Sequence, residues 1–145
     1  MNRTDRCDGD PQEGRTEAMI VIRGDDLAPR TARNLVTDAF TRWGLDSDTA
    51  RTVISELVTN AHLHGCAHTE TNMIVVRTWL RTDGTAVVEV WDPSDTMPIR
   101  GTQNNTAESG RGLLMVEQMA SGWGARPLAN GGKVVWASLS RTLEN

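Results

Sequence analysis

The residues best suited to chemistry follow one another at intervals of four near the end of a predicted helix. Glu56, Asn60 and His64 fall on one side of that helix, along the edge of an apolar stripe between residues 50 and 61. Side chains in this position can line a cleft, where an acid can accept a proton and an amide oxygen can bind a hard cation such as Mg²⁺. The same spacing also fits a solvated helix flank, so other segments of the chain must decide between the two.

A second acidic residue, Asp92, directly follows a predicted strand and precedes Pro93, which ends the hydrogen bonding of that strand. A carboxylate at the end of a strand can accept a hydrogen bond from the exocyclic amine of adenine. Taken alone, Asp92 also fits a turn-forming residue before proline.

The segment Gly110, Arg111, Gly112 directly precedes a predicted helix. Glycines let backbone amides approach a phosphate closely, and the N-terminus of a helix attracts anions. Arg111 can add charge-assisted hydrogen bonds to the same anion. The alternative is a flexible loop that enters an ordinary helix, and the segment matches neither the P-loop nor the dinucleotide-binding pattern.

All three histidines and Cys66 lie between residues 62 and 68, so a zinc site is an alternative for this segment. His62 and His64 point about 200° apart on a helix, which prevents them from sharing a metal ion unless the helix end unwinds. We therefore favour a hydrogen-bonding or structural role for His64.

Hydrophobic periodicity predicts a chain of alternating strands and helices. Hairpin-linked strands favour a mainly antiparallel sheet, and three helices can cover one of its faces. We predict an α+β fold, a two-layer α/β sandwich whose mixed, mostly antiparallel sheet carries its helices on one face. The predicted strands are Ala18–Ile22, Asn72–Leu80, Ala86–Trp91, a strand around Trp123 and Lys133–Leu139, and the predicted helices are about Ala32–Trp43, a second capped by Asp46 or Ser47 and running to about His64, and about Leu113–Ala120.

Residues 81–85 have the composition of a hairpin loop between two of these strands. If the loop is symmetric about Asp83, Arg77 lies opposite Glu89. We expect these two side chains to form a cross-strand ion pair on the exposed face of the sheet.

At 145 residues, with 38% hydrophobic and 23% charged residues, the chain has the composition of one globular domain. We expect a disordered tail at residues 1–16 and one folded domain at residues 17–145. The net charge of −4 argues against direct nucleic-acid binding, and no apolar run suits a membrane span or a secretory signal. The two cysteines form no disulfide framework, so we expect a cytoplasmic protein. Lys133 is the only lysine among 15 basic residues, a bias that we attribute to genome composition.

Four segments, read in order, carry a resemblance to a known family: ELVTNAHLHG, VEVWDPSDTMP, SGRGLLMVEQMASGWG and GGKVVW. With them the chain resembles the GHKL, or histidine-kinase-like, ATPase superfamily over about residues 32–139. It is most similar to the ATP-binding proteins of the anti-sigma-factor serine kinase branch, particularly their actinobacterial relatives. Four motifs in this order and spacing are more specific than any one of them.

The resemblance implies a role for each candidate residue. Asn60 would hold Mg²⁺ against the ATP phosphates, Glu56 would be the general base, and Asp92 would read adenine. The glycine box at residues 110–112 would meet the phosphates through its amides, and residues 96–109 would form a short ATP lid. The implied ATP-binding residues are Asn60, His64, Asp92, Ser94, Gly110, Arg111, Gly112 and Leu113.

The chain departs from the family pattern at two positions. Ser94 stands where the first glycine box has its glycine, so a side chain lies where backbone normally approaches the nucleotide. In the last box, Val134 stands where relatives often have a threonine that assists adenine recognition. Both changes weaken nucleotide handling without removing Glu56 or Asn60.

The resemblance implies an ATP- and Mg²⁺-dependent protein serine/threonine kinase that acts on an anti-sigma-factor antagonist. Its second partner would be a sigma factor, and a homodimer is possible because relatives often dimerise. The alternative is a non-catalytic regulator that binds ATP and acts only through partner binding. The departures at Ser94 and Val134 motivate that alternative.

Overall fold

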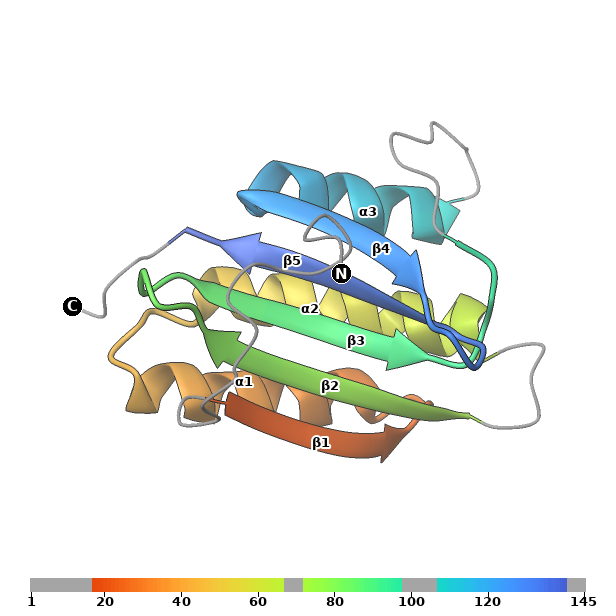
Figure 1. Cartoon of the computed structure of the whole chain (residues 1–145), viewed down its shortest axis with the longest axis horizontal. Coiled ribbons are helices and arrows are strands. Elements are labelled where there is room, and N and C mark those ends of the chain that lie inside the picture. Colours follow the sequence, from red (N-terminus) through yellow and green to blue (C-terminus); the bar gives the residue numbers. More distant parts are fainter. Residues whose placement is uncertain (1–16, 67–71, 98–106, 141–145) are drawn as a thin grey trace.

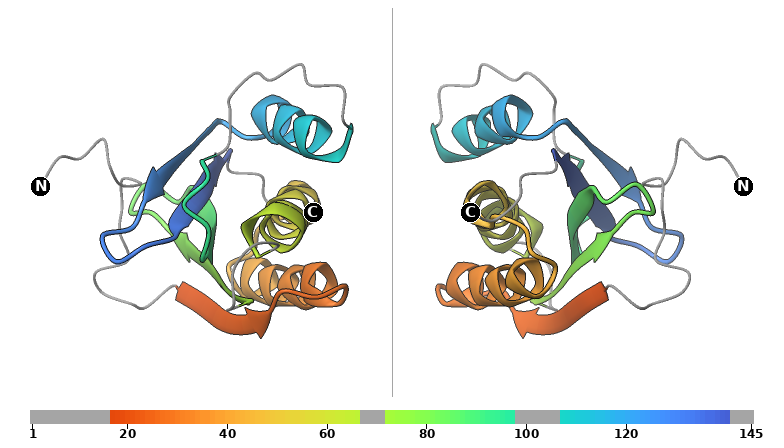
Figure 2. Two further views of the ribbon diagram at one scale, coloured as in Figure 1. Left: turned by 90° about the vertical axis from the view of Figure 1, so that its right-hand side faces the viewer. Right: turned by 90° about the vertical axis from the view of Figure 1, so that its left-hand side faces the viewer.

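The computed structural model describes residues 17–66, 72–97 and 107–140. Within them a five-stranded sheet, in the order β1-β2-β3-β5-β4, has its helices on one face (Figures 1 and 2). The predicted two-layer α+β fold is confirmed, and every strand pairing of the described sheet is antiparallel where the prediction allowed a mixed sheet. The elements are β1 (Glu17–Arg23), α1 (Ala28–Arg42), α2 (Asp48–Asn60), the π-helical turn η2 (Ala61–Gly65), β2 (Met73–Leu80), β3 (Ala86–Asp92), α3 (Ala107–Met119), β4 (Gly122–Pro127) and β5 (Lys133–Leu139).

The ends of the first two helices follow the predicted signals. Gly44, with φ of 73°, follows the end of α1 in a conformation that favours glycine. Ser47 occupies the N-cap position of α2, but the side chain that accepts a backbone hydrogen bond there is that of Asp46, whose Oδ1 lies 3.0 Å from the amide nitrogen of Asp48. Of the two residues proposed as alternative caps, Ser47 therefore holds the N-cap position and Asp46 supplies the side-chain hydrogen bond.

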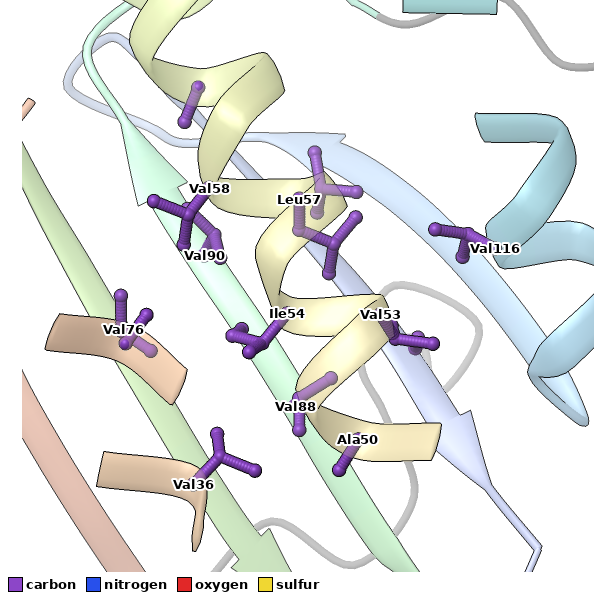
Figure 3. Packing of buried hydrophobic residues seen from close by; sticks show 14 of the residues in the cluster. Val36, Ala50, Val53, Ile54, Leu57, Val58, Val76, Val88, Val90 and Val116 are labelled. Carbon is purple, nitrogen blue, oxygen red and sulfur yellow. The ribbon is translucent and has the colours of Figure 1, made fainter. Parts of the chain in front are cut away.

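Helix α2 is the centre of the hydrophobic core (Figure 3). Its apolar stripe contacts the sheet through Ile54 and Val58, which lie over residues of β3 such as Val90. On the other side, Val53 and Leu57 turn toward α3. All four α2 side chains are buried, because the sheet, α1 and α3 enclose this helix on three sides. The polar flank of α2 is consequently held at a fixed rotation relative to the sheet.

The hairpin between β2 and β3 has the predicted register. Arg77 pairs with Glu89 across the two strands, and Arg77 Nε lies 2.7 Å from Glu89 Oε1. The prediction that this pair is exposed is wrong, because the Glu89 side chain is only 4% exposed. Trp91 donates its indole N–H to Glu89 at 2.8 Å, and the Arg77 guanidinium lies 4.4 Å from the ring centre of Trp79. The large tryptophan side chains on this face thus help to bury Glu89, whereas the Arg77 side chain remains 22% exposed.

Some predictions fall outside the described residues. The tail at residues 1–16, most of the loop at residues 98–106 and the segment 67–71, which contains His68, are among them. No helix in the described ranges is long and apolar enough to cross a membrane.

The buried Glu89 makes stability depend on pH in a defined direction. Burial raises the pKa of Glu89, although Arg77 and Trp91 both favour the charged form. A carboxyl whose pKa is raised by folding contributes stability that is present below its ordinary pKa and is lost as the pH rises through the raised value. We predict that the Glu89→Gln variant gains in free energy of unfolding, relative to wild type, as the pH rises from about 4 to about 7.

Urea denaturation at a series of pH values measures this difference. Glu17→Gln is the matched control, since Glu17 is a second carboxyl near Arg77, at 3.5 Å, but its side chain is 25% exposed. A difference between Glu89→Gln and wild type that stays constant with pH, or that moves in the opposite direction, contradicts the prediction.

Candidate functional site

The end of α2 carries the first group of candidate residues. Glu56 and Asn60 are half-buried, as expected for side chains along the edge of the apolar stripe, and His64 is exposed. After Asn60 the helix continues as the π-helical turn η2. Such turns are rare in proteins, and those that occur are often found at functional sites. The predicted extent of the helix, to the region of His64 and Gly65, therefore agrees with α2 and η2 taken together.

The neighbouring residues His62 and Cys66 make contacts that hold η2 against the rest of the fold. His62 Nε2 lies 3.3 Å from Asp26 Oδ1, which joins η2 to the turn before α1. Cys66 is buried against Gly24, where an added Cβ would lie 2.9 Å from Cys66 Sγ. No group of three or more His, Cys, Asp or Glu side chains arranged to hold a metal ion occurs in the part of the chain that the structure describes.

Asp92 lies at the end of β3 and forms a buried ion pair with Lys133 at the beginning of β5. The two residues are cross-strand partners, and Lys133 Nζ lies 3.0 Å from Asp92 Oδ1. Their side chains are 2% and 8% exposed, respectively. The backbone N–H of Ser94 donates to the same Oδ1 at 2.8 Å. The carboxylate is thereby held in one orientation by a cation and a backbone amide.

Burial raises the pKa of the Asp92 carboxyl above its ordinary value, because the charged form loses hydration. The hydrogen bond from Lys133, the amide of Ser94 and the Lys133 charge act in the opposite direction. Burial likewise raises the pKa of the Cys66 thiol, and the Asp92 charge contributes to that shift. Asp92 and Cys66 therefore belong to one electrostatic environment, between the end of η2 and the end of β3.

The loop after β3 is tied to the turn before β5. Ser94 Oγ accepts the backbone N–H of Thr96 at 3.0 Å, so the side chain that replaces the expected glycine is engaged within its own loop. Asp95 Oδ1 accepts the backbone N–H of Gly132 at 2.8 Å. Gly132 approaches the backbone so closely that an added Cβ would lie 2.5 Å from the carbonyl oxygen of Asp92. The surroundings of Asp92 are therefore preorganised by backbone contacts.

The glycine box does not open its helix as predicted. Helix α3 begins at Ala107, so Gly110, Arg111 and Gly112 lie within its first two turns rather than before it. Helix N–H groups beyond the first four bond to carbonyls of the preceding turn, so the free amides belong to the start of α3. The early start escaped prediction because residues 107–109 are polar or small and carry no apolar periodicity. Leu113 is buried in the core.

The fold brings three predicted groups to one end of the molecule. The end of α2, the end of β3 and the beginning of α3 lie together on the right-hand side of Figure 1. Helix α2 packs against α3, and both α2 and η2 contact β3. The elements that carry a carboxamide, a carboxylate and a helix N-terminus, far apart in sequence, therefore share one end of the molecule. This set of groups suits the metal, the base and the phosphates of a nucleotide.

Lys133 is the residue of this site that the sequence did not indicate as functional. The register of β3 with β5 places Lys133 opposite Asp92, and Val134 opposite Trp91. The cross-strand neighbour of the proposed adenine-reading carboxylate is thus Lys133. Its status as the only lysine in the chain was the available signal.

The fold and the arrangement of these groups define a nucleotide-binding domain with a two-layer α+β architecture. The family model of the histidine kinase-like ATPase domain matches residues 25–139, and the chain belongs to this family. The crystal structure of the RsbU and RsbW domains of Rv1364c from Mycobacterium tuberculosis has a similar fold, with a TM-score of 0.66 at 24% identity. The match covers 89% of this chain and 34% of that one, so the chain spans about a third of that structure. No relative among curated proteins matches the chain.

The contact between Gly132 and Asp92 leads to a test with an internal control. Gly131 and Gly132 have φ values of 101° and 87°, and both disfavour a side chain. An added Cβ at Gly131 meets nothing within 4 Å, whereas at Gly132 it meets the Asp92 carbonyl. We predict that Gly131→Ala costs about 1–2 kcal/mol from backbone strain, and that Gly132→Ala costs roughly a further 1–3 kcal/mol from the clash.

Chemical denaturation of the two variants measures both losses. If Gly131→Ala and Gly132→Ala are destabilised equally, the close approach of Gly132 to the end of β3 does not constrain the fold.

Proposed function

We propose that this histidine kinase-like ATPase domain is an anti-sigma-factor-type regulator that binds ATP with Mg²⁺ and phosphorylates a serine or threonine. The expected substrate is an anti-sigma-factor antagonist, and the second partner is a sigma factor, both in the cytoplasm. Membership of the family supports nucleotide binding. The resemblance of the four motifs to the anti-sigma-factor serine kinase branch supports the kinase activity and the partners.

The observation that carries the proposal is the meeting of α2, β3 and α3 at one end of the molecule. Asn60, half-buried at the end of α2, offers an amide oxygen of the kind that Mg²⁺ binds. Asp92 offers a buried acceptor to an amino group of the base, and it is already oriented by Ser94 and Lys133. The side chains of Asn60 and Asp92 therefore fit a Mg²⁺–nucleotide complex.

Each residue has a distinct part in the proposed reaction. Glu56, one helical turn before Asn60, would orient the substrate hydroxyl and take its proton as the oxygen attacks phosphorus. Bound Mg²⁺ supplies positive charge that neutralises the phosphoryl group during transfer. The start of α3 would hold phosphate oxygens through its free amides. Because Glu56 and Asn60 lie on one rigid helix, their separation is fixed before substrate binds.

A non-catalytic ATP-binding regulator is the second candidate. The observations that favour it are the side chain at Ser94 and the helical conformation of Gly110 and Gly112. In that conformation their amides are used within α3, so fewer of them are free to bind phosphate. Such a protein would respond to ATP by a change in partner affinity alone.

For the metal-binding role, we predict that Asn60→Ala abolishes Mg²⁺-dependent ATP binding. The variant loses the amide oxygen proposed to hold the cation, and with it the bridge between protein and phosphates. Calorimetric titration with ATP, with and without Mg²⁺, measures the effect. Thr52→Ala is the control on the same helix, since the hydrogen bond that the Thr52 hydroxyl makes among the described residues is to the carbonyl of Asp48. Mg²⁺-dependent binding by Asn60→Ala at the wild-type level contradicts the assignment.

For the general base, we predict that Glu56→Ala retains ATP binding and loses phosphoryl transfer by a factor of about 10²–10⁴. Incubation with labelled ATP and candidate antagonist proteins measures transfer, and calorimetry measures binding. Equal losses in the two assays contradict a role as base. ATP binding by wild type without a Glu56-dependent phosphoprotein supports the non-catalytic regulator instead.

A further inference from the structure

The only lysine of the chain, Lys133, is buried beside the carboxylate proposed to bind the base. Its side chain is 8% exposed, and its ammonium lies 3.0 Å from Asp92 Oδ1. A lysine is almost never buried without a specific partner, because its charge loses hydration. The other fourteen basic residues of the chain are arginines, whose planar guanidinium is a different hydrogen-bonding group. Lys133 is therefore a buried cation held by one specific partner, Asp92.

The hydrogen bonds at this pair leave specific atoms available. Both bonds that the described residues make to the Asp92 carboxylate, from Lys133 and from the amide of Ser94, end on Oδ1. Oδ2 of the same carboxylate remains an acceptor. An ammonium has three donors, and among the described contacts Lys133 uses one, to Asp92. The pair thus presents an acceptor next to a cationic donor, on two strands held in fixed register.

We propose that Lys133 is a specificity-determining residue of the nucleotide site, which holds Asp92 as an ionised acceptor and places a donor beside it to select adenine over guanine. This inference rests on the proposed nucleotide site.

The selectivity for adenine over guanine follows from the hydrogen-bonding groups along the edge of the purine. Adenine has an amino group that donates next to a ring nitrogen that accepts. The amino group complements the Asp92 carboxylate, and the ring nitrogen complements the Lys133 ammonium. Guanine has a carbonyl acceptor next to a ring N–H donor, so in the same orientation it opposes both groups. A buried polar group that meets a like group is left unpaired, and this rejects the wrong ligand more strongly than a missing contact does.

Lys133 also controls the charge of Asp92. Among the described residues, the titratable groups that interact with Asp92 are Lys133 from β5 and the Cys66 thiol after η2, while the exposed Asp95 of the following loop binds the Gly132 amide. Burial raises the pKa of Asp92, and the Lys133 hydrogen bond and charge lower it. Without Lys133, desolvation is opposed only by the amide of Ser94. The carboxyl then takes a proton at higher pH and ceases to be an acceptor for the amine.

The test compares Lys133→Met, which removes the charge at similar length, with Lys133→Arg, which keeps it. Competition of ATP and GTP for a fluorescent ATP analogue is measured between about pH 6 and about pH 8, where a carboxyl with a pKa strongly raised by burial begins to take up a proton. In Lys133→Met, we expect the preference for ATP over GTP to fall on the order of tenfold. Its affinity for ATP should also fall as the pH decreases. In wild type and Lys133→Arg, the preference should persist and vary little with pH.

A second measurement needs no nucleotide. Carbon-13 NMR titration of the Asp92 carboxyl in the free protein should show a higher pKa in Lys133→Met than in wild type. Lys133→Gln, which keeps a donor but no charge, serves the same purpose if Lys133→Met does not fold. Its ATP preference should be retained at high pH and lost at low pH.

The outcomes separate the inference from the proposed function. If wild type binds ATP but Lys133→Met or Lys133→Gln keeps the same ATP preference and pH profile, Lys133 does not determine specificity and the inference fails alone. An unchanged Asp92 pKa in the free variant also overturns it. If wild type binds neither ATP nor GTP, the proposed function fails, and the inference fails with it.

Discussion

The antiparallel pairing of β3 with β5 is the constraint on which the rest of the molecule depends. It joins two strands that are separated in sequence by the segment containing α3 and β4. Because α3 precedes β4, this pairing also brings α3 against α2 and closes the core around Val53 and Leu57. The same pairing sets Asp92 opposite Lys133. Fold and candidate site thus depend on one non-local contact.

A buried ion pair at this position has a cost that its geometry must offset. Removing two charges from water is unfavourable, and the pair is tolerated only where direct contact and further hydrogen bonds compensate. Here the amide of Ser94 supplies an additional bond to Asp92. Gly132 permits the close approach of the backbone that brings the two strand ends together. The ion pair fixes the orientation of the Asp92 carboxylate at some cost in stability, as is typical of binding sites.

The opposite face of the sheet uses a second buried ion pair to different effect. Arg77 and Glu89 lie across β2 and β3, and Trp79 and Trp91 contact the guanidinium. Large aromatic side chains surround the pair, so Glu89 is buried on the outer face of the sheet while Arg77 remains partly exposed. The two ion pairs lie at opposite faces of the same strand, β3, and both are defined by strand register.

The sequence by itself determined the features that depend on neighbours along the chain. Helical periodicity identified α1 and α2, with Glu56 and Asn60 on the polar flank. The loop at residues 81–85 determined that Arg77 pairs with Glu89. Only the tertiary structure decided the burial of Glu89, the start of α3 at Ala107 and the pairing of Asp92 with Lys133. The reason is physical: a turn or a helical stripe is specified by residues a few positions apart, whereas burial and the β3–β5 register depend on how separate elements pack, which local patterns do not encode.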